Sequence, residues 1–294
     1  MSLILDPTLP AAEVLRQEGF TVLDRGSATP DLRIGLINLM PKKQETELDF
    51  MRMLGGTNLS VEVELIYMGS HVSRSTNREY IQRYYRQFPE VAADGLDGLI
   101  VTGAPLDNVA FENVDYWEEI CSIFDYVRDL RIPTFNVCWG AFAWVYHYYG
   151  IGFWVLPRKI SGIYPNRINY PDDPIMKGLD AEFYVPCSRF ASWPQQEIRD
   201  IESEIIVAES DCESGIYILK NREVPVYSFV SHGEYSTLTL DSEYRRDLGR
   251  NLNPHIPENY YPNDDPEATP VNTWTVPARK IYANWLHSIK SNQL

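Results

Sequence analysis

Short, almost wholly apolar segments that alternate with helical patterns constrain the fold of this chain most strongly. LRIGLINLM at 32–40 is a near-continuous apolar run, LDGLIVTGAP at 96–105 has the pattern of another buried strand, and 133–150 combines a strand with a sharp turn and a helix. Runs of this kind are typical of parallel strands that are buried on both faces. VEVELIYM at 61–68 alternates apolar and polar residues, which also indicates a strand.

Amphipathic patterns between these runs predict helices. They fall at 44–54, 77–88, 114–130 and 278–290. Strands that alternate with helices predict an α/β fold with a doubly wound, mostly parallel sheet flanked by helices. Three further apolar segments predict antiparallel additions in the C-terminal half: EIIVA at 204–208, GIYIL at 215–219 and VYSFV at 226–230. We expect residues 1–30 to form a lead-in segment and residues 31–294 to form a single domain.

The composition excludes several partners. A net charge of −15 over 294 residues argues against nucleic-acid or anionic-membrane binding, because both favour a basic face. No stretch approaches the ~20 apolar residues of a membrane helix, and the first twenty residues lack a basic start, so we expect no secretory signal. The four cysteines form no CxxC pair, which favours reduced thiols and a cytoplasmic location.

Cys138 has the setting of a nucleophile. In the run NVCWGA at 136–141 an apolar strand leads into the cysteine, which a small-residue turn and a helix follow. Such a turn presents a side chain at the carboxyl edge of a parallel sheet, where these folds place their sites. The helix N-terminus lowers a thiol pKa and supplies N–H donors for an oxyanion. A free cysteine is more often a small buried hydrophobe, so the prediction needs a second element.

A histidine supplies that second element. VYSFVSHGEY at 226–235 is a strand that ends near His232, with Glu234 two residues further on. A nucleophile needs a base, and the base needs an orienting acceptor, so Cys138, His232 and Glu234 fit a catalytic triad. The other histidines, and two of the other cysteines, lack this setting: His71, His147, His255, His287, Cys121 and Cys212.

Other site classes have weak signals. The chain contains no GxxxxGK[ST] or GxGxxG motif for nucleotide phosphates, and no HExxH motif for a metal. We therefore expect no bound metal and no bound cofactor. The turn at 101–105, which includes Gly103, is as consistent with a plain turn as with the border of a pocket.

Seven further runs are distinctive: LINLMPKKQETE (36–47), LIVTGAPLDNVAFENVDYW (99–117), CWGAFAWVYHYYGI (138–151), KISGIY (159–164), PCSR (186–189), HGEYSTLTLDSEYRRD (232–247) and NYYPNDDP (259–266). Together they resemble the homoserine O-acyltransferase family, whose members include homoserine O-succinyltransferases and O-acetyltransferases. The resemblance spans roughly residues 30–290. It implies a fold similar to class I glutamine amidotransferases, a homodimer, and an acyltransferase domain over residues 31–294.

The resemblance also implies roles for single residues. Cys138 matches the acyl-thioester nucleophile, His232 the proton acceptor and Glu234 its partner. Lys159, Ser188 and Arg246 match residues that hold the amino-acid substrate, and a planar arginine fork suits a carboxylate. Trp139 N–H is a candidate oxyanion donor. Lys42 and Lys43 are either contacts for the phosphates of coenzyme A (CoA) or solvated lysines.

Asp107 lies where the family distinguishes acyl donors: glutamate there goes with acetyl-CoA and glycine with succinyl-CoA. A carboxylate beside the acyl pocket repels the succinyl carboxylate, so we favour acetyl-CoA as co-substrate. Three departures from the family pattern, Phe142, Cys187 and Gly233, lie close to candidate site residues in the sequence.

The expected reaction is therefore acetyl transfer through a cysteine thioester to L-homoserine, in methionine biosynthesis. Serine O-acetyltransfer, in cysteine biosynthesis, and succinyl-CoA as donor are alternatives, because a pocket distinguishes one methylene by only ~1–3 kcal/mol. A glutamine amidotransferase-like hydrolase and a non-catalytic binding protein are alternatives of other classes.

Overall fold

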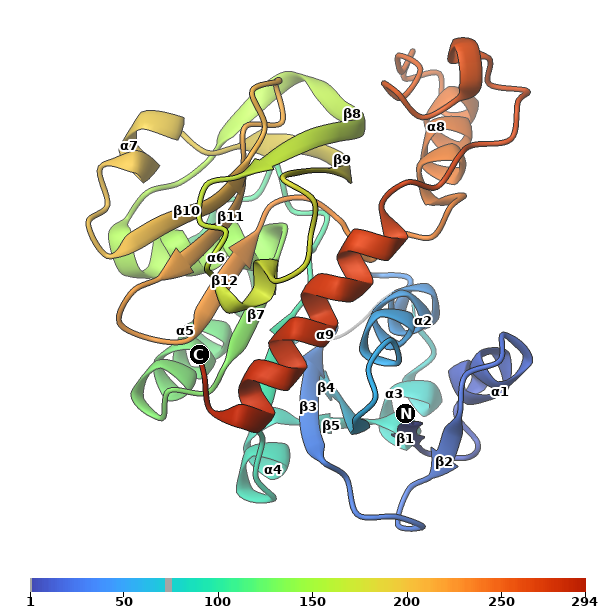
Figure 1. Cartoon of the computed structure of the whole chain (residues 1–294), viewed down its shortest axis with the longest axis vertical. Helices are drawn as coiled ribbons and strands as arrows, with labels where there is room; N and C mark the ends of the chain where they lie inside the picture. Colours follow the sequence, from blue (N-terminus) through green and yellow to red (C-terminus); the bar gives the residue numbers. More distant parts are fainter. Residues whose placement is uncertain (1, 72–75) are drawn as a thin grey trace.

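A single twelve-stranded sheet organises the molecule, seen in Figure 1. The computed structural model describes residues 2–71 and 76–294. The strands run in the order β2-β1-β4-β3-β6-β7-β12-β11-β10-β8-β9, and β5 pairs with β4. Their bounds are β1 (Ser2–Leu5), β2 (Val22–Asp24), β3 (Leu32–Ile37), β4 (Ser60–Tyr67), β5 (Tyr85–Gln87), β6 (Gly98–Val101), β7 (Thr134–Val137), β8 (Trp154–Ile168), β9 (Glu182–Ser192), β10 (Glu204–Glu209), β11 (Ile216–Asn221) and β12 (Val226–Phe229).

The sheet is parallel in one half and antiparallel in the other, which confirms the predicted fold class. Every pairing from β2 across to β12 is parallel. Strands β11, β10, β8 and β9 then add antiparallel pairings. The segment 226–230 was predicted as an antiparallel addition, but β12 is parallel to β7 and antiparallel only to β11.

Helices cover both faces of the sheet. Residues of α1, α2 and α9 pack on one face, and residues of α4, α5, α6 and α7 pack on the other. Their bounds are α1 (Pro10–Gln17), α2 (Lys43–Leu54), α3 (Arg78–Tyr84), α4 (Phe88–Ala93), α5 (Trp117–Asp129), α6 (Trp139–Tyr149), α7 (Gln195–Arg199), α8 (Thr239–Gly249) and α9 (Thr275–Ser291), with 3-10 turns at Phe111–Asn113, Pro174–Met176 and Pro262–Asp264. In the part of the chain that the structure describes, no helix is long and apolar enough to cross a membrane.

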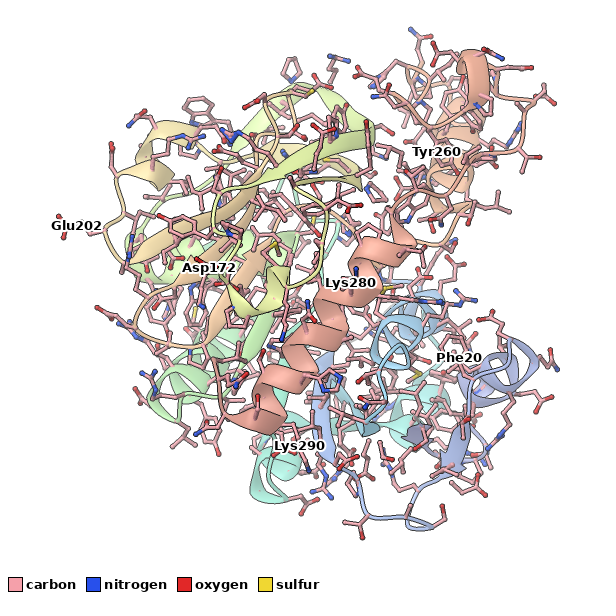
Figure 2. All side chains as sticks on the ribbon, viewed as in Figure 1. Phe20, Asp172, Glu202, Tyr260, Lys280 and Lys290 are labelled. Atoms are coloured by element: carbon pink, nitrogen blue, oxygen red, sulfur yellow. The ribbon has the colours of Figure 1, made fainter. Side chains whose placement is uncertain are left out.

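The closing helix α9 lies across the parallel strands. Its buried Ile281 and Trp285 join the core on that face, and Trp285 stacks on Phe135 of β7 with ring centroids 4.2 Å apart. Lys280 and Lys290 mark the course of this helix in Figure 2. The prediction of a helix at 278–290 is confirmed, and the helix begins three residues earlier.

The segment 77–88 is not the single helix that its pattern predicted. Helix α3 ends at Tyr84, and Tyr85 begins the short strand β5, which pairs with β4 opposite Leu65. The Tyr85 hydroxyl donates to the buried carboxylate of Glu47 at 2.5 Å. Pairing with a neighbouring strand therefore outweighs helix propensity here, as tertiary contacts often do.

The N-terminal segment contributes to the sheet itself. Residues 1–30, predicted as a lead-in, supply β1 and β2, which extend the parallel half beyond β4. Helix α1 packs its buried Ala12 and Leu15 into the core on the α9 side.

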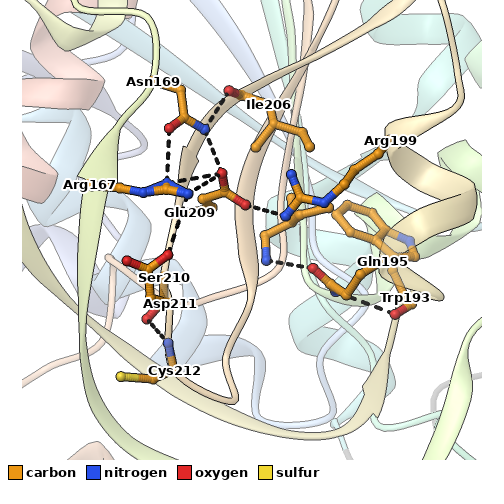
Figure 3. Close-up of polar contacts among 11 residues, drawn as sticks. Arg167, Asn169, Trp193, Gln195, Arg199, Ile206, Glu209, Ser210, Asp211 and Cys212 are labelled. Carbon is orange, nitrogen blue, oxygen red and sulfur yellow. Dashed lines mark hydrogen bonds and ion pairs between the residues drawn. The ribbon is translucent and has the colours of Figure 1, made fainter.

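A buried carboxylate holds the antiparallel half together. Glu209 of β10 accepts hydrogen bonds from Arg167 of β8 at 2.8 Å and from Asn169 at 2.9 Å, and it pairs with Arg199 of α7 (Figure 3). Burial raises the pKa of Glu209, but its arginine and asparagine partners lower it further, so its net pKa lies below the usual value. These charge-assisted bonds connect β8, β10 and α7.

Candidate active site

The candidate nucleophile lies where the parallel strands end. Cys138 follows β7 directly and has φ 51° and ψ −111°, an uncommon conformation for a residue with a side chain. Its N–H donates to the Phe229 carbonyl oxygen of the neighbouring strand β12 at 2.6 Å, which holds the turn in place. Strain of this kind persists only where the surroundings enforce it, and it is frequent at active sites.

Helix α6 begins immediately after the cysteine. Trp139 is its first residue, and its backbone N–H finds no acceptor among residues 2–71 and 76–294. Free N–H groups at a helix N-terminus attract negative charge. The indole ring of Trp139 is buried between Phe111 and Tyr116, with ring centroids 5.8 and 5.7 Å away. Of the two N–H groups of Trp139, the backbone N–H, and not the buried indole N–H, is therefore the candidate donor next to Cys138.

His232 and Glu234 form a buried pair. Nδ1 of His232 lies 2.6 Å from Oε1 of Glu234, both side chains are 6% exposed, and the imidazole stacks on Tyr235. Burial lowers the pKa of His232, but the Glu234 carboxylate and the Cys138 sulfur outweigh that effect, so the net pKa lies well above its ordinary value. The imidazole therefore has the Glu234 carboxylate on one side and the Cys138 sulfur nearby as its two interaction partners.

Gly103 brings the thiol and the imidazole to one point. A Cβ placed on Gly103 would lie 3.1 Å from Cβ and 3.6 Å from Sγ of Cys138, and 3.8 Å from Cε1 of His232. Cys138 and His232 therefore both face the end of β6. The sequence alone left this turn ambiguous, and the structure places it against the two candidate catalytic residues, where a larger residue would crowd the sulfur.

Lys159 and Ser188 meet at a carboxylate that sequence reasoning missed. Glu243 of α8 accepts hydrogen bonds from Lys159 Nζ at 2.7 Å, from the Ser188 hydroxyl, and from the Tyr235 hydroxyl at 3.3 Å. Burial raises the pKa of Glu243, but Lys159 and Ser188 lower it further, so its net pKa is below its usual value. Since Tyr235 also stacks on His232, this cluster adjoins the catalytic pair.

Arg246 belongs to the same cluster through Asp247. Its Nε and Nη2 both lie 2.8 Å from Oδ1 of Asp247, and Oδ2 of Asp247 lies 3.5 Å from Lys159 Nζ. The three predicted substrate residues, Lys159, Ser188 and Arg246, are thus brought together by two carboxylates of α8. Glu243 and Asp247 are four residues apart with buried Leu240 on the same helical face, a spacing that could have identified them.

The carboxyl group of Asp107 interacts electrostatically with Lys159 of the Glu243 cluster and with His232 of the catalytic pair. Burial raises the pKa of its carboxyl, and nearby cations offset only part of that rise. Those cations are Lys159, Arg189 and His232. The residue predicted to distinguish acyl donors therefore lies within electrostatic range of both Lys159 and His232.

Lys42 and Lys43 have different environments. Lys42 is exposed and pairs with Glu45 at 2.9 Å. Lys43 is buried and donates to the backbone carbonyl of Asn38 at 2.5 Å, and burial lowers its pKa to about 8. Lys43 is therefore neither a solvated lysine nor a surface contact for CoA phosphates, because its ammonium is bound inside the protein.

The three departures from the family pattern all lie in packed regions. Phe142 packs against Phe153 and Trp193, and Cys187 is fully buried in a cluster with Ile160. A Cβ on Gly233 would lie 3.0 Å from Cβ of Ala278 on α9. None of these contacts places a polar group beside Glu243.

The fold and these groups define a class of protein: a doubly wound α/β protein with a candidate cysteine nucleophile at a strand-to-helix turn and a buried His–Glu pair beside it. Within the described ranges, no three His, Cys, Asp or Glu side chains are grouped to hold a metal ion.

Comparisons with known proteins identify the family. Residues 2–293 match the model of the homoserine O-succinyltransferase family. Homoserine O-acetyltransferases from Bacteroides fragilis and Acetivibrio thermocellus are 41% and 40% identical over 291 residues, which are 98% of this chain and 95% of each relative. The chain belongs to this family of O-acyltransferases, as its sequence motifs indicated.

Solved structures of low sequence identity share the fold. A glutamine amidotransferase from Thermotoga maritima superposes with a TM-score of 0.57 at 11% identity, over 89% of this chain and 99% of that one. The glutaminase domain of Trypanosoma brucei CTPS gives a TM-score of 0.51 at 10% identity, over 90% and 95%. The predicted glutamine amidotransferase-like fold is thus confirmed.

Proposed function

We propose that this enzyme transfers an acetyl group from acetyl-CoA through a thioester on Cys138 to the hydroxyl of L-homoserine. The observation that carries the proposal is the arrangement of Cys138, His232 and Glu234 next to a separate cluster of paired charges around Glu243. The first group suits acyl transfer, and the second suits a zwitterionic amino acid. Acetyl transfer to homoserine would place the enzyme in methionine biosynthesis.

The first half-reaction forms the acyl-enzyme. His232 holds the proton of the Cys138 thiol, and the thiolate attacks the thioester carbonyl carbon of acetyl-CoA. The Trp139 N–H stabilises the oxyanion of the tetrahedral intermediate. The bond between the acyl carbon and the CoA sulfur then breaks, and His232 returns its proton to that sulfur. Glu234 keeps the imidazole oriented and stabilises its charge.

The second half-reaction releases the product. The amino acid binds with its ammonium near Glu243 and its carboxylate near Lys159 and Arg246. His232, now neutral, takes the proton of the substrate hydroxyl, whose oxygen attacks the acyl carbon. The carbon–sulfur bond to Cys138 breaks, the O-acetyl ester forms, and the thiolate–imidazolium pair is restored. Two half-reactions of this kind give ping-pong kinetics.

One experiment can identify the acyl donor and the amino-acid acceptor independently. Purified protein is incubated with acetyl-CoA or succinyl-CoA, each alone and then with homoserine or serine, while thiol release and intact mass are followed. We expect an acetyl adduct on Cys138 that homoserine discharges. If only serine discharges the adduct, serine and not homoserine is the acceptor. If no adduct forms and ammonia is released from glutamine, the reaction is amide hydrolysis and not acyl transfer.

The charge of Asp107 is expected to reject succinyl-CoA. Replacing Asp107 with glycine removes a carboxylate that would face the succinyl carboxylate, and repulsion of about 1–2 kcal/mol corresponds to a gain of about tenfold in kcat/KM for succinyl-CoA. The values of kcat/KM for acetyl-CoA and succinyl-CoA are compared between Asp107→Gly and a control, Asp211→Gly. The control removes an exposed aspartate that pairs with Arg167. An unchanged ratio of the two donors in Asp107→Gly would rule out the electrostatic explanation.

We further propose a cytoplasmic homodimer. The reaction needs a reduced Cys138, and all four cysteines are free thiols in the structure. Strand β9 is the last strand of the sheet and carries the exposed side chains of Tyr184 and Phe190. Proteins usually cover such an edge, which supports pairing with a second copy.

A further inference from the structure

Helix α8 carries two carboxylates that contact Lys159, and the proposed scheme uses only Glu243, which receives the substrate ammonium. The proposed reaction gives no role to Asp247, although its side chain is only 9% exposed. A buried carboxylate is costly unless cations and hydrogen bonds compensate it. Its partners are Arg246 and Lys159, the two cations that the proposed function assigns to the substrate carboxylate.

The contact with Arg246 is unusual for neighbours on a helix. Consecutive helical residues point about 100° apart and do not normally face each other. The Arg246 side chain, which is 44% exposed, nevertheless turns back so that Nε and Nη2 both contact Oδ1 of Asp247 at 2.8 Å. Without Asp247, this side chain would extend from the helix toward solvent with its full rotamer freedom.

The contact with Asp247 also leaves one edge of the Arg246 guanidinium free to bind a substrate carboxylate. A guanidinium has two edges that bind a carboxylate in a bidentate way: Nε with Nη2, and Nη1 with Nη2. Asp247 occupies the first edge, and Nη1 has no partner among the described residues. The second edge is therefore fixed in direction and available to a carboxylate.

The same aspartate contacts the second cation. Oδ2 of Asp247 lies 3.5 Å from Nζ of Lys159, whose other carboxylate partner, Glu243, lies at 2.7 Å. The cluster of Lys159, Arg246, Glu243 and Asp247 thus carries two positive and two negative charges. A zwitterion adds no net charge to it, whereas loss of Asp247 leaves one uncompensated cation.

We propose that Asp247 is a positioning residue that orients the Arg246 guanidinium and the Lys159 ammonium toward the carboxylate of the acceptor amino acid. It touches neither the acyl group nor the sulfur. The inference rests on the proposed function, since it assigns Arg246 and Lys159 to the acceptor. It predicts that Asp247 affects the second half-reaction and not the first.

The test uses the full-length enzyme and two matched variants. Asp247→Asn keeps the shape and one acceptor oxygen but removes the charge. Asp241→Asn makes the same change on the same helix, at an aspartate that pairs with Arg245 at 3.0 Å. For each protein we measure KM for the amino acid, the rate of CoA release in the first turnover, and the melting temperature.

We expect Asp247→Asn to raise KM for the amino acid at least about tenfold, with the rate of first-turnover CoA release unchanged, while Asp241→Asn behaves like the wild type. An unchanged KM in Asp247→Asn would overturn the inference. So would a fall in first-turnover CoA release that parallels the rise in KM, because that result indicates a general structural role. Absence of acylation in the wild type would instead refute the proposed function, so the two failures are distinguishable.

Discussion

Replacing Cys138 with alanine is expected to lower acyl transfer by about 10⁴-fold or more and to leave the fold intact. The thioester needs this sulfur, and no other thiol is placed to substitute for it. Burial raises the pKa of Cys121 to about 12, and Cys212 is exposed in a loop. Loss of a nucleophile that acts with its base removes most of the rate enhancement. Thiol release and intact mass after addition of acetyl-CoA provide the measurement.

The matched control is Cys212→Ala, which also removes one thiol and should retain wild-type turnover. Because alanine also carries a Cβ and meets the same backbone strain at φ 51°, Cys138→Ala should melt near the wild-type temperature. Turnover near the wild-type rate in Cys138→Ala would contradict a covalent mechanism. A direct transfer from CoA to the amino acid would then be the better description.

Replacing Glu234 with glutamine is expected to lower kcat/KM by about 10²–10⁴-fold. The amide keeps the size of the side chain but removes the negative charge 2.6 Å from Nδ1 of His232. Since the Glu234 charge helps to raise the pKa of His232 well above its ordinary value, its removal lowers that pKa. The imidazolium is then lost at lower pH, and the alkaline limb of the acylation rate moves to lower pH.

The measurement is the acylation rate as a function of pH for the wild type and Glu234→Gln. Asp125→Asn is the control, since Asp125 lies 2.8 Å from Nε2 of His147 in an equivalent pair on the surface. We expect that control to keep both the rate and the pH profile of the wild type. A profile of Glu234→Gln that keeps its alkaline limb at the wild-type pH would contradict the role given to Glu234.

Much of the fold followed from local patterns. The buried runs ending near Ile37, Val101 and Val137 became parallel strands, because continuous apolar sequence has few other solutions in an α/β protein. The long hairpin of β8 and β9 gave no such signal. Proline, tyrosine and charged residues interrupt its alternation, and its register is broken between Val155 and Ile160.

The candidate site was predictable in part for a similar reason. Cys138 and His232 each follow a strand of the parallel half, so the ends of β7 and β12 bring them together. Glu243 and Asp247 were missed because they lie on α8, outside any strand end. Their role depends on contact with Lys159, more than eighty residues earlier in the chain. Only the folded structure brings these segments together.

The location of α8 separates two tasks that one active site must perform. The nucleophile lies between β7 and α6 in the central sheet, where its sequence neighbours Val137 and Trp139 are buried in the core. Three of the four acceptor charges, Glu243, Arg246 and Asp247, lie on α8, a peripheral helix that Figure 1 shows beside the sheet, and the fourth, Lys159, lies on β8. Evolution or protein engineering can therefore alter acceptor preference through substitutions on α8 and leave the chemistry at the sulfur untouched.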